Sequence, residues 1–105
     1  MNNRQFAIPS NTSVVTSTYV MQDKLPILYV SHEDDDGESL WQFHCGNNDF
    51  SMGKMMLVGL GAVLATDSSL MELADLKKGF CATRKSLDTS WHIKLDRARD
   101  SQGHE

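Results

Sequence analysis

The sequence predicts a single α+β domain with a mainly antiparallel sheet and one or two short helices. Short runs of β-branched and aromatic residues recur along the chain, and clusters of turn-forming residues separate them. The helical signals between these runs are brief. No long crossover segment separates the strands, as a parallel sheet would require. At 105 residues, the chain is long enough to bury one modest core.

The clearest element is a β-hairpin within residues 26–46, PILYVSHEDDDGESLWQFHCG. Two apolar and aromatic runs flank Asp36-Gly37, a pair typical of tight hairpin turns. A two-residue turn at this position sets three cross-strand pairs: Val30 with Phe43, Leu28 with Cys45, and His32 with Trp41. The turn and the hydrophobic alternation then agree, because one face of the hairpin collects the apolar residues. We expect this face to be buried, with these members: Leu28, Val30, Trp41, Phe43 and Cys45.

The domain is expected to span residues 12–93. Residues 1–11 are polar and are expected to form a flexible N-terminal tail, and residues 94–105 a polar C-terminal tail. The first element is expected to be a strand near Val14–Thr18, although residues 17–22 could instead form one helical turn.

The second half of the domain is expected to alternate short strands and short helices. A helix capped by Asp67 or Ser69 and ended by Gly79 is the best marked of these, because Ser69 and Glu72 fit a capping box. The expected elements are, in order, a strand at 55–58, a helix at 60–65, the capped helix, a strand at 80–84 and a closing segment at 87–93 that contains Trp91.

The acidic charge of the chain is concentrated in the hairpin turn. Glu33–Glu38 holds five of the 14 acidic residues, so nine acids remain against ten lysines and arginines elsewhere. The net charge of −4 is therefore essentially one acidic segment, and no basic face for nucleic acid is visible. We expect a protein partner rather than a nucleic acid.

The sequence favours a soluble, cytoplasmic protein without membrane association. Residues 1–13 lack the apolar core of a signal peptide, and the longest apolar stretch, residues 55–65, is shorter than the about 20 residues of a membrane span. Cys45 and Cys81 both lie in expected strands. In a reducing compartment we expect them to be buried thiols rather than a disulfide.

The acidic turn is the candidate functional site. Its partner-binding residues would be the five carboxylates Glu33, Asp34, Asp35, Asp36 and Glu38. A calcium loop fits poorly, because aligning Gly37 with an EF-hand glycine puts His32 first and Phe43 twelfth, where oxygen donors are needed. An irregular cation site is the remaining alternative. Asp35 and Glu38 are expected to face each other across the hairpin, where like charges repel.

Enzymatic chemistry finds little support in the sequence, and we expect no catalytic residue, metal or cofactor. Gly59-Leu60-Gly61 resembles the start of a dinucleotide fingerprint, but its third glycine is replaced by Leu64 and the chain is too short for a doubly wound sheet. The histidines and cysteines lack zinc-ligand spacing, and no serine lies in a nucleophile elbow. A Cys81–His92 nucleophile pair is the remaining formal possibility.

The order of segments over about residues 16–93 resembles a family of small bacterial domains of unknown function, sometimes grouped with immunity proteins of polymorphic toxin systems. The chain departs from the family pattern by an inserted Glu38-Ser39-Leu40, by Gly59 in place of serine and by Lys77 in place of proline. The matching residues are Pro26 to Val30, His32, the acidic turn with Gly37, Trp41 to Phe43, Gly46, Leu57, Val58, Leu60, Gly61, Asp67, Ser69, Leu70, Glu72, Leu73, Ala74, Asp75, Leu76, Gly79 and Trp91.

The resemblance implies a non-catalytic protein-binding domain that neutralises a cognate toxin, with no cofactor. A basic toxin domain would then be the partner of the acidic turn. The alternative is a housekeeping interaction module whose partner is unrelated to toxins.

Overall fold

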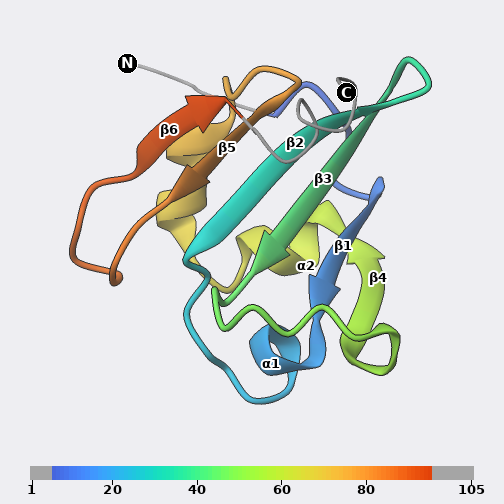
Figure 1. Cartoon of the computed structure of the whole chain (residues 1–105). Helices are drawn as coiled ribbons and strands as arrows, with labels where there is room; N and C mark the ends of the chain where they lie inside the picture. Colours follow the sequence, from blue (N-terminus) through green and yellow to red (C-terminus); the bar gives the residue numbers. More distant parts are fainter. Residues whose placement is uncertain (1–5, 96–105) are drawn as a thin grey trace, which may run out of the picture.

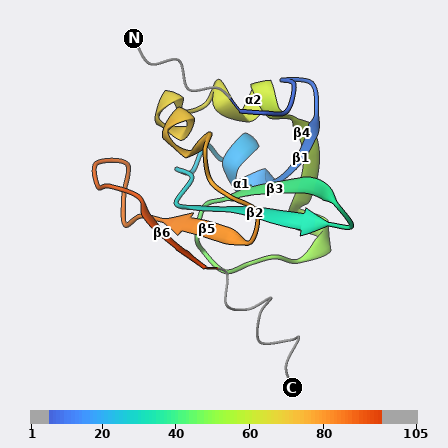
Figure 2. The same ribbon diagram turned by 90° about the horizontal axis from the view of Figure 1, so that it is seen from above.

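A computed structural model describes residues 6–95, which form one six-stranded sheet with short helical segments on one face (Figures 1 and 2). The strand order is β4-β1-β3-β2-β5-β6, and all neighbours are antiparallel except β1 and β3. This arrangement confirms the α+β fold class. The strands are β1 (Ser13–Ser17), β2 (Tyr29–Asp35), β3 (Glu38–His44), β4 (Met55–Gly59), β5 (Phe80–Thr83) and β6 (His92–Leu95). The helical segments are α1 (Thr18–Met21), α2 (Leu60–Leu64) and the 3₁₀ helices η1 (Met52–Lys54) and η2 (Ser68–Leu73).

The β2–β3 hairpin has the register that the sequence predicts. Val30 pairs with Phe43 and His32 with Trp41, and the pairing continues to Asp35 and Glu38 beside the turn. Asp36 and Gly37 have φ angles of 58° and 91°. Two successive positive φ angles define the tight turn whose twist matches that of the strands, which is why aspartate and glycine occupy it.

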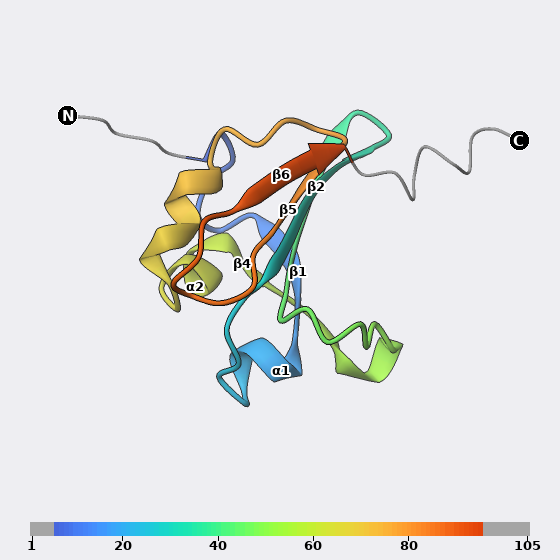
Figure 3. The same cartoon turned by 60° about the vertical axis from the view of Figure 1, so that its left-hand side comes forward.

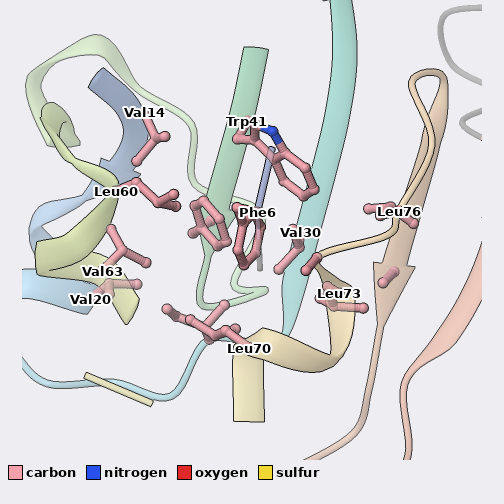
Figure 4. Close-up of a cluster of buried hydrophobic side chains, with 14 of the residues drawn as sticks. Phe6, Val14, Val20, Val30, Trp41, Leu60, Val63, Leu70, Leu73 and Leu76 are labelled. Carbon is pink, nitrogen blue, oxygen red and sulfur yellow. The ribbon is translucent and has the colours of Figure 1, made fainter. Parts of the chain in front are cut away.

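The core lies between the sheet and the helical segments (Figure 4). Trp41 is 3% exposed, Val30 and Phe43 are fully buried, and Cys45 is also buried, so four members of the predicted face are confirmed. Leu28 is half-buried and lies outside the core cluster, and its neighbour Ile27 is buried instead. Strand alternation does not extend to Leu28, because β2 begins only at Tyr29.

Phe6 belongs to this core although it falls within the range expected to be a flexible tail. Its ring meets the ring of Trp41 edge-on, with the centroids 4.8 Å apart and the planes at 70°, and Phe6 is 9% exposed. The short segment around it has no strand or helix periodicity that would mark this anchor in the sequence. Residues 1–5 and 96–105, the remainder of the two expected tails, lie outside the described residues, and β6 reaches Leu95 within the expected C-terminal tail.

Residues 13–21 form both of the elements that the sequence left open. β1 ends at Ser17, whose side chain then caps α1 by accepting a hydrogen bond from the Val20 N–H at 3.4 Å. Asp67 caps η2 by accepting from the Ser69 N–H at 2.9 Å.

No helix within residues 6–95 combines the length and apolar character needed to cross a bilayer.

A buried arginine ties β5 to the helical layer. Arg84 donates from Nε and Nη2 to the Ile27 carbonyl, and Nη2 also lies 2.6 Å from the Asp67 carboxylate. Its guanidinium carbon lies 4.1 Å from the ring centroid of Trp91. Trp91 therefore covers the ion pair of Arg84 with Asp67.

Candidate functional site

The five carboxylates predicted as a partner-binding site lie at and near the tip of the β2–β3 hairpin, which projects beyond the rest of the sheet (Figures 1 and 3). We call the part of the hairpin that carries these five side chains, residues 33–38, the acidic hairpin. Four of them are exposed: Asp34, Asp35, Asp36 and Glu38. Glu33 is half-buried.

Glu33 belongs to a polar row along the sheet face opposite the helices. Its carboxylate accepts hydrogen bonds from the Ser31 hydroxyl and the Gln42 amide, each at 3.2 Å. The Gln42 amide oxygen in turn accepts from His44 Nε2 at 2.9 Å. The structure thus divides the predicted site into an exposed tip of four carboxylates and one carboxylate engaged in the sheet.

Lys78, just before β5, contacts the tip. Its ammonium donates to the Gly37 carbonyl at 2.8 Å and lies 3.7 Å from the Asp34 carboxylate. Asp34 also accepts from the Gly37 N–H at 2.9 Å, so it shapes the turn as well as carrying charge. This contact with the tip depends on the pairing of β2 with β5, which no local pattern in the sequence indicates.

Two carboxylates oppose each other across the hairpin. Asp35 and Glu38 are directly paired residues of β2 and β3, as the sequence predicted. Like charges at such positions repel, which opposes hairpin formation in the isolated protein. The tip therefore carries a charge arrangement that a cationic partner would relieve.

His32 ties the base of the acidic hairpin to the rest of the domain. Its ring stacks on Trp41, with the centroids 4.0 Å apart and the planes at 14°. Nδ1 lies 2.6 Å from the Leu76 carbonyl, and Nε2 lies 2.9 Å from the Ser39 hydroxyl. Since the carbonyl can only accept, Nδ1 is the donor in the neutral ring and Nε2 accepts from Ser39.

The environment of His32 favours this neutral form. Burial lowers the pKa of His32, and the Lys78 ammonium acts in the same direction, whereas the bond to the Leu76 carbonyl opposes them. The neutral ring keeps both of its hydrogen bonds, so the hairpin is attached to the domain by a packed and bonded side chain.

His44 is a second buried histidine, on the sheet face opposite the helices. Tyr29 stacks on its ring with centroids 6.1 Å apart, and Phe50 approaches edge-on at 4.8 Å. Burial lowers the pKa of His44 to about 4. The ring is therefore neutral near pH 7 and serves as a donor to Gln42.

The formal Cys81–His92 pair does not form a directly opposed cross-strand pair. Cys81 lies opposite Lys94, and His92 lies opposite Thr83. Cys81 is buried and His92 is exposed. Cys45 and Cys81 are both held as buried thiols.

The described residues offer no metal centre of ordinary composition. Within residues 6–95, no group of three or more histidine, cysteine, aspartate or glutamate side chains is arranged so that it could hold a metal ion.

Comparison of the chain with known protein families, curated proteins and solved structures finds no match. The geometry of the tip is that of an exposed anionic surface on a firmly attached arm.

Proposed function

We propose that the protein is a non-catalytic binding domain that captures a basic protein through the acidic hairpin, as an immunity protein captures its cognate toxin in the bacterial cytoplasm. The observation that carries the proposal is the exposure of four carboxylates at the tip of a projecting hairpin, two of them directly opposed. The family resemblance of the hairpin and the helical middle supports the immunity assignment. A housekeeping module with a basic partner would use the same surface and differ only in what it binds.

A charged tip of this kind acts mainly on the rate of association. Complementary charge raises the rate of encounter between two proteins by about 10- to 1000-fold and loses this effect as salt screens it. The attachment of the hairpin through His32 and Trp41 presents the charges on a pre-organised arm. Little ordering would then be needed on binding.

The test compares two charge-matched variants of the full chain. Asp35→Asn with Glu38→Gln removes the opposed pair and leaves the turn contacts of Asp34 in place. Asp23→Asn with Asp88→Asn removes two exposed carboxylates that follow α1 and β5, away from the hairpin tip (Figure 1). The proposal predicts that a basic toxin domain is encoded beside this gene, and that domain is the partner to use.

We expect the hairpin variant to associate about three- to tenfold more slowly at low salt, and the control variant to associate at the original rate. Equal rates for the two variants would contradict the proposal. A neighbouring operon of metabolic genes without a toxin would favour the housekeeping module.

A further inference from the structure

β4 forms one edge of the sheet and carries no charged side chain, whereas β6 at the other edge exposes Lys94 (Figure 1). The sequence of β4 is MMLVG, and its central residue Leu57 is 70% exposed. Sheet proteins commonly protect an edge with charges, prolines or bulges, because an unprotected edge pairs with further strands. β4 has neither charge nor proline, and its register with β1 runs without a bulge. It is therefore the edge that is open to pairing.

The ladder between β1 and β4 shows which backbone groups of β4 point away from the sheet. The Leu60 N–H donates to the Thr12 carbonyl at 2.9 Å, directly beyond the last residue of β4. Bonded and non-bonded pairs alternate along an antiparallel ladder, so every second residue before Leu60 also bonds to β1. Those residues are Met56 and Val58. The backbone groups of the three other residues of β4 face outward: Met55, Leu57 and Gly59.

Two of these outward residues each have one backbone group engaged within the chain. The Met55 N–H donates to the Met52 carbonyl. Gly59 is the N-cap of α2, so its carbonyl accepts the first bond of that helix. The groups that remain are the Met55 carbonyl, the N–H and carbonyl of Leu57, and the Gly59 N–H. Within residues 6–95, β4 pairs with β1 alone, so no strand there takes up these groups.

The remaining groups are self-complementary about Leu57. When two β4 strands run antiparallel with Leu57 opposite Leu57, each of these residues donates to the other and accepts from it. The same register places Met55 of each strand opposite Gly59 of the other. The remaining Gly59 N–H then meets the remaining Met55 carbonyl, once on each side of the centre. A contact about a twofold axis requires a surface that matches itself in this way.

We infer that β4 pairs with the β4 strand of a second copy of this chain and joins two six-stranded sheets into one. Val58 packs against the core, so Leu57 beside it points to the open face of the sheet. The two Leu57 side chains would bury each other there, at the twofold axis. Met52, which is 86% exposed just before β4, would lie toward the start of α2 in the second copy. This assembly goes beyond the proposed function and does not depend on it.

The direction of β4 keeps the acidic hairpins of the two copies apart, although each copy carries a net charge of −4. β4 runs antiparallel to β1, β1 parallel to β3, and β3 antiparallel to β2. β4 and β2 therefore run in the same direction, toward the tip of the acidic hairpin. An antiparallel pair of β4 strands consequently sends the two tips to opposite ends of the joined sheet.

The charged residue next to β4 also leaves the pairing unopposed. Lys54 immediately precedes the strand, and its ammonium lies 5.5 Å from the ring centroid of Tyr19. The Tyr19 hydroxyl donates to the Asp49 carboxylate, so an opposite charge accompanies Lys54. In the paired strands the two Lys54 residues are separated by about 20 Å, at about 3.4 Å per residue, which exceeds the Debye length of about 8 Å.

The test measures the self-association of the full chain and follows its backbone amides by hydrogen exchange. Sedimentation equilibrium covers about 20 µM to about 1 mM protein, because a contact limited to short strands gives a weak dimer. Leu57→Lys places two like charges opposite each other at the twofold axis. Ile93→Lys adds the same charge at the β6 edge and is the matched control, since Ile93 is 52% exposed. Circular dichroism verifies that both variants fold.

We expect a monomer–dimer equilibrium with a Kd between about 10 µM and about 1 mM. Leu57→Lys should weaken the dimer by at least about tenfold, whereas Ile93→Lys should leave it unchanged. Exchange of the Leu57 and Gly59 amides should slow as the protein concentration rises. The amides of Met56 and Val58, which bond to β1, should exchange slowly at both ends of the range.

A protein that is still monomeric at about 1 mM would overturn the inference, as would a dimer that both lysine variants weaken equally. Slow exchange of the Leu57 amide at every concentration would show instead that the edge is covered within one copy. Slow exchange that appears only when a basic toxin domain is added would assign the edge to that partner. Because self-association is measured without a partner, its failure leaves the proposed role of the acidic hairpin standing.

Discussion

Lys78 and Asp34 join the acidic tip to β5. The Lys78 ammonium lies 3.7 Å from the Asp34 carboxylate and donates to the carbonyl of Gly37 in the turn, at 2.8 Å. Asp34 itself accepts from the Gly37 N–H. One cation thus partly offsets the charge of the tip and helps to fix its shape.

Replacing Lys78 with glutamine separates these two effects. Both partners of the ion pair are well exposed, so the free energy of unfolding should fall by less than about 1 kcal/mol. The tip becomes more negative, so association with a basic partner should become faster at low salt. Stopped-flow association and chemical denaturation measure the two quantities. A slower association would show that Lys78 matters more for tip shape than for charge.

Trp41→Ala should lower the free energy of unfolding by about 3–5 kcal/mol, because the ring is buried among aromatic neighbours. Trp41→Phe, which retains an aromatic ring, is the control and should cost less. Urea denaturation followed by circular dichroism measures both. A loss below about 1 kcal/mol for the alanine variant would contradict the packing described for Phe6, His32 and Trp41.

The stability of the protein should fall as the pH drops from about 6.5 toward about 4, because His44 is buried in its neutral form. Its pKa is lowered to about 4, so across this interval the unfolded chain binds the proton and the folded chain does not. The largest contribution of this one group is about 3 kcal/mol. His44→Phe retains a ring between Tyr29 and Phe50 and should have a flatter dependence of unfolding free energy on pH. Parallel curves for the two proteins would exclude this role for His44.

A second loss of stability is expected at lower pH from the ion pair of Asp67 and Arg84. Burial acts to raise the pKa of Asp67, but hydrogen bonds from Ser69 and Arg84 and the charge of Arg84 outweigh it, so the pKa is lowered. The stabilisation is therefore present above the ordinary value of 3.8 and is lost as the pH falls through the lower folded value. Asp67→Asn should be less stable at pH 7 and lack this last step in an acid titration. An unchanged step in the variant would assign it to another carboxyl group.

Cys45 and Cys81 should react slowly with a thiol reagent in the native protein and quickly after unfolding, since both thiols are buried. Timed labelling with and without urea, followed by mass spectrometry, tests this. Rapid native modification of both residues would contradict their placement.

The hairpin could be predicted because short-range signals agree. The Asp36-Gly37 turn and the alternation of apolar residues each specify the same register, and the structure has it. Asp35 therefore faces Glu38 as expected.

Long-range contacts account for what the sequence did not reveal. No periodic pattern around Phe6 indicates that its ring packs on Trp41. Lys78 reaches the tip only because β5 pairs with β2, and the Glu33 bond to Gln42 depends on side-chain geometry across two strands. Such contacts have no periodic signature in one sequence.

The most direct test is the salt dependence of association between this protein and the basic toxin domain that the proposed function predicts to be encoded beside its gene. We predict that the association rate of the unmodified protein falls steeply between about 20 mM and about 500 mM salt. Over this range the Debye length shortens, so salt increasingly screens the carboxylates of the tip from the approaching partner. The variant with Asp35→Asn and Glu38→Gln should show a slower rate at low salt and a flatter salt dependence than the Asp23→Asn, Asp88→Asn control. Identical salt dependence for all three proteins would contradict capture through the acidic hairpin.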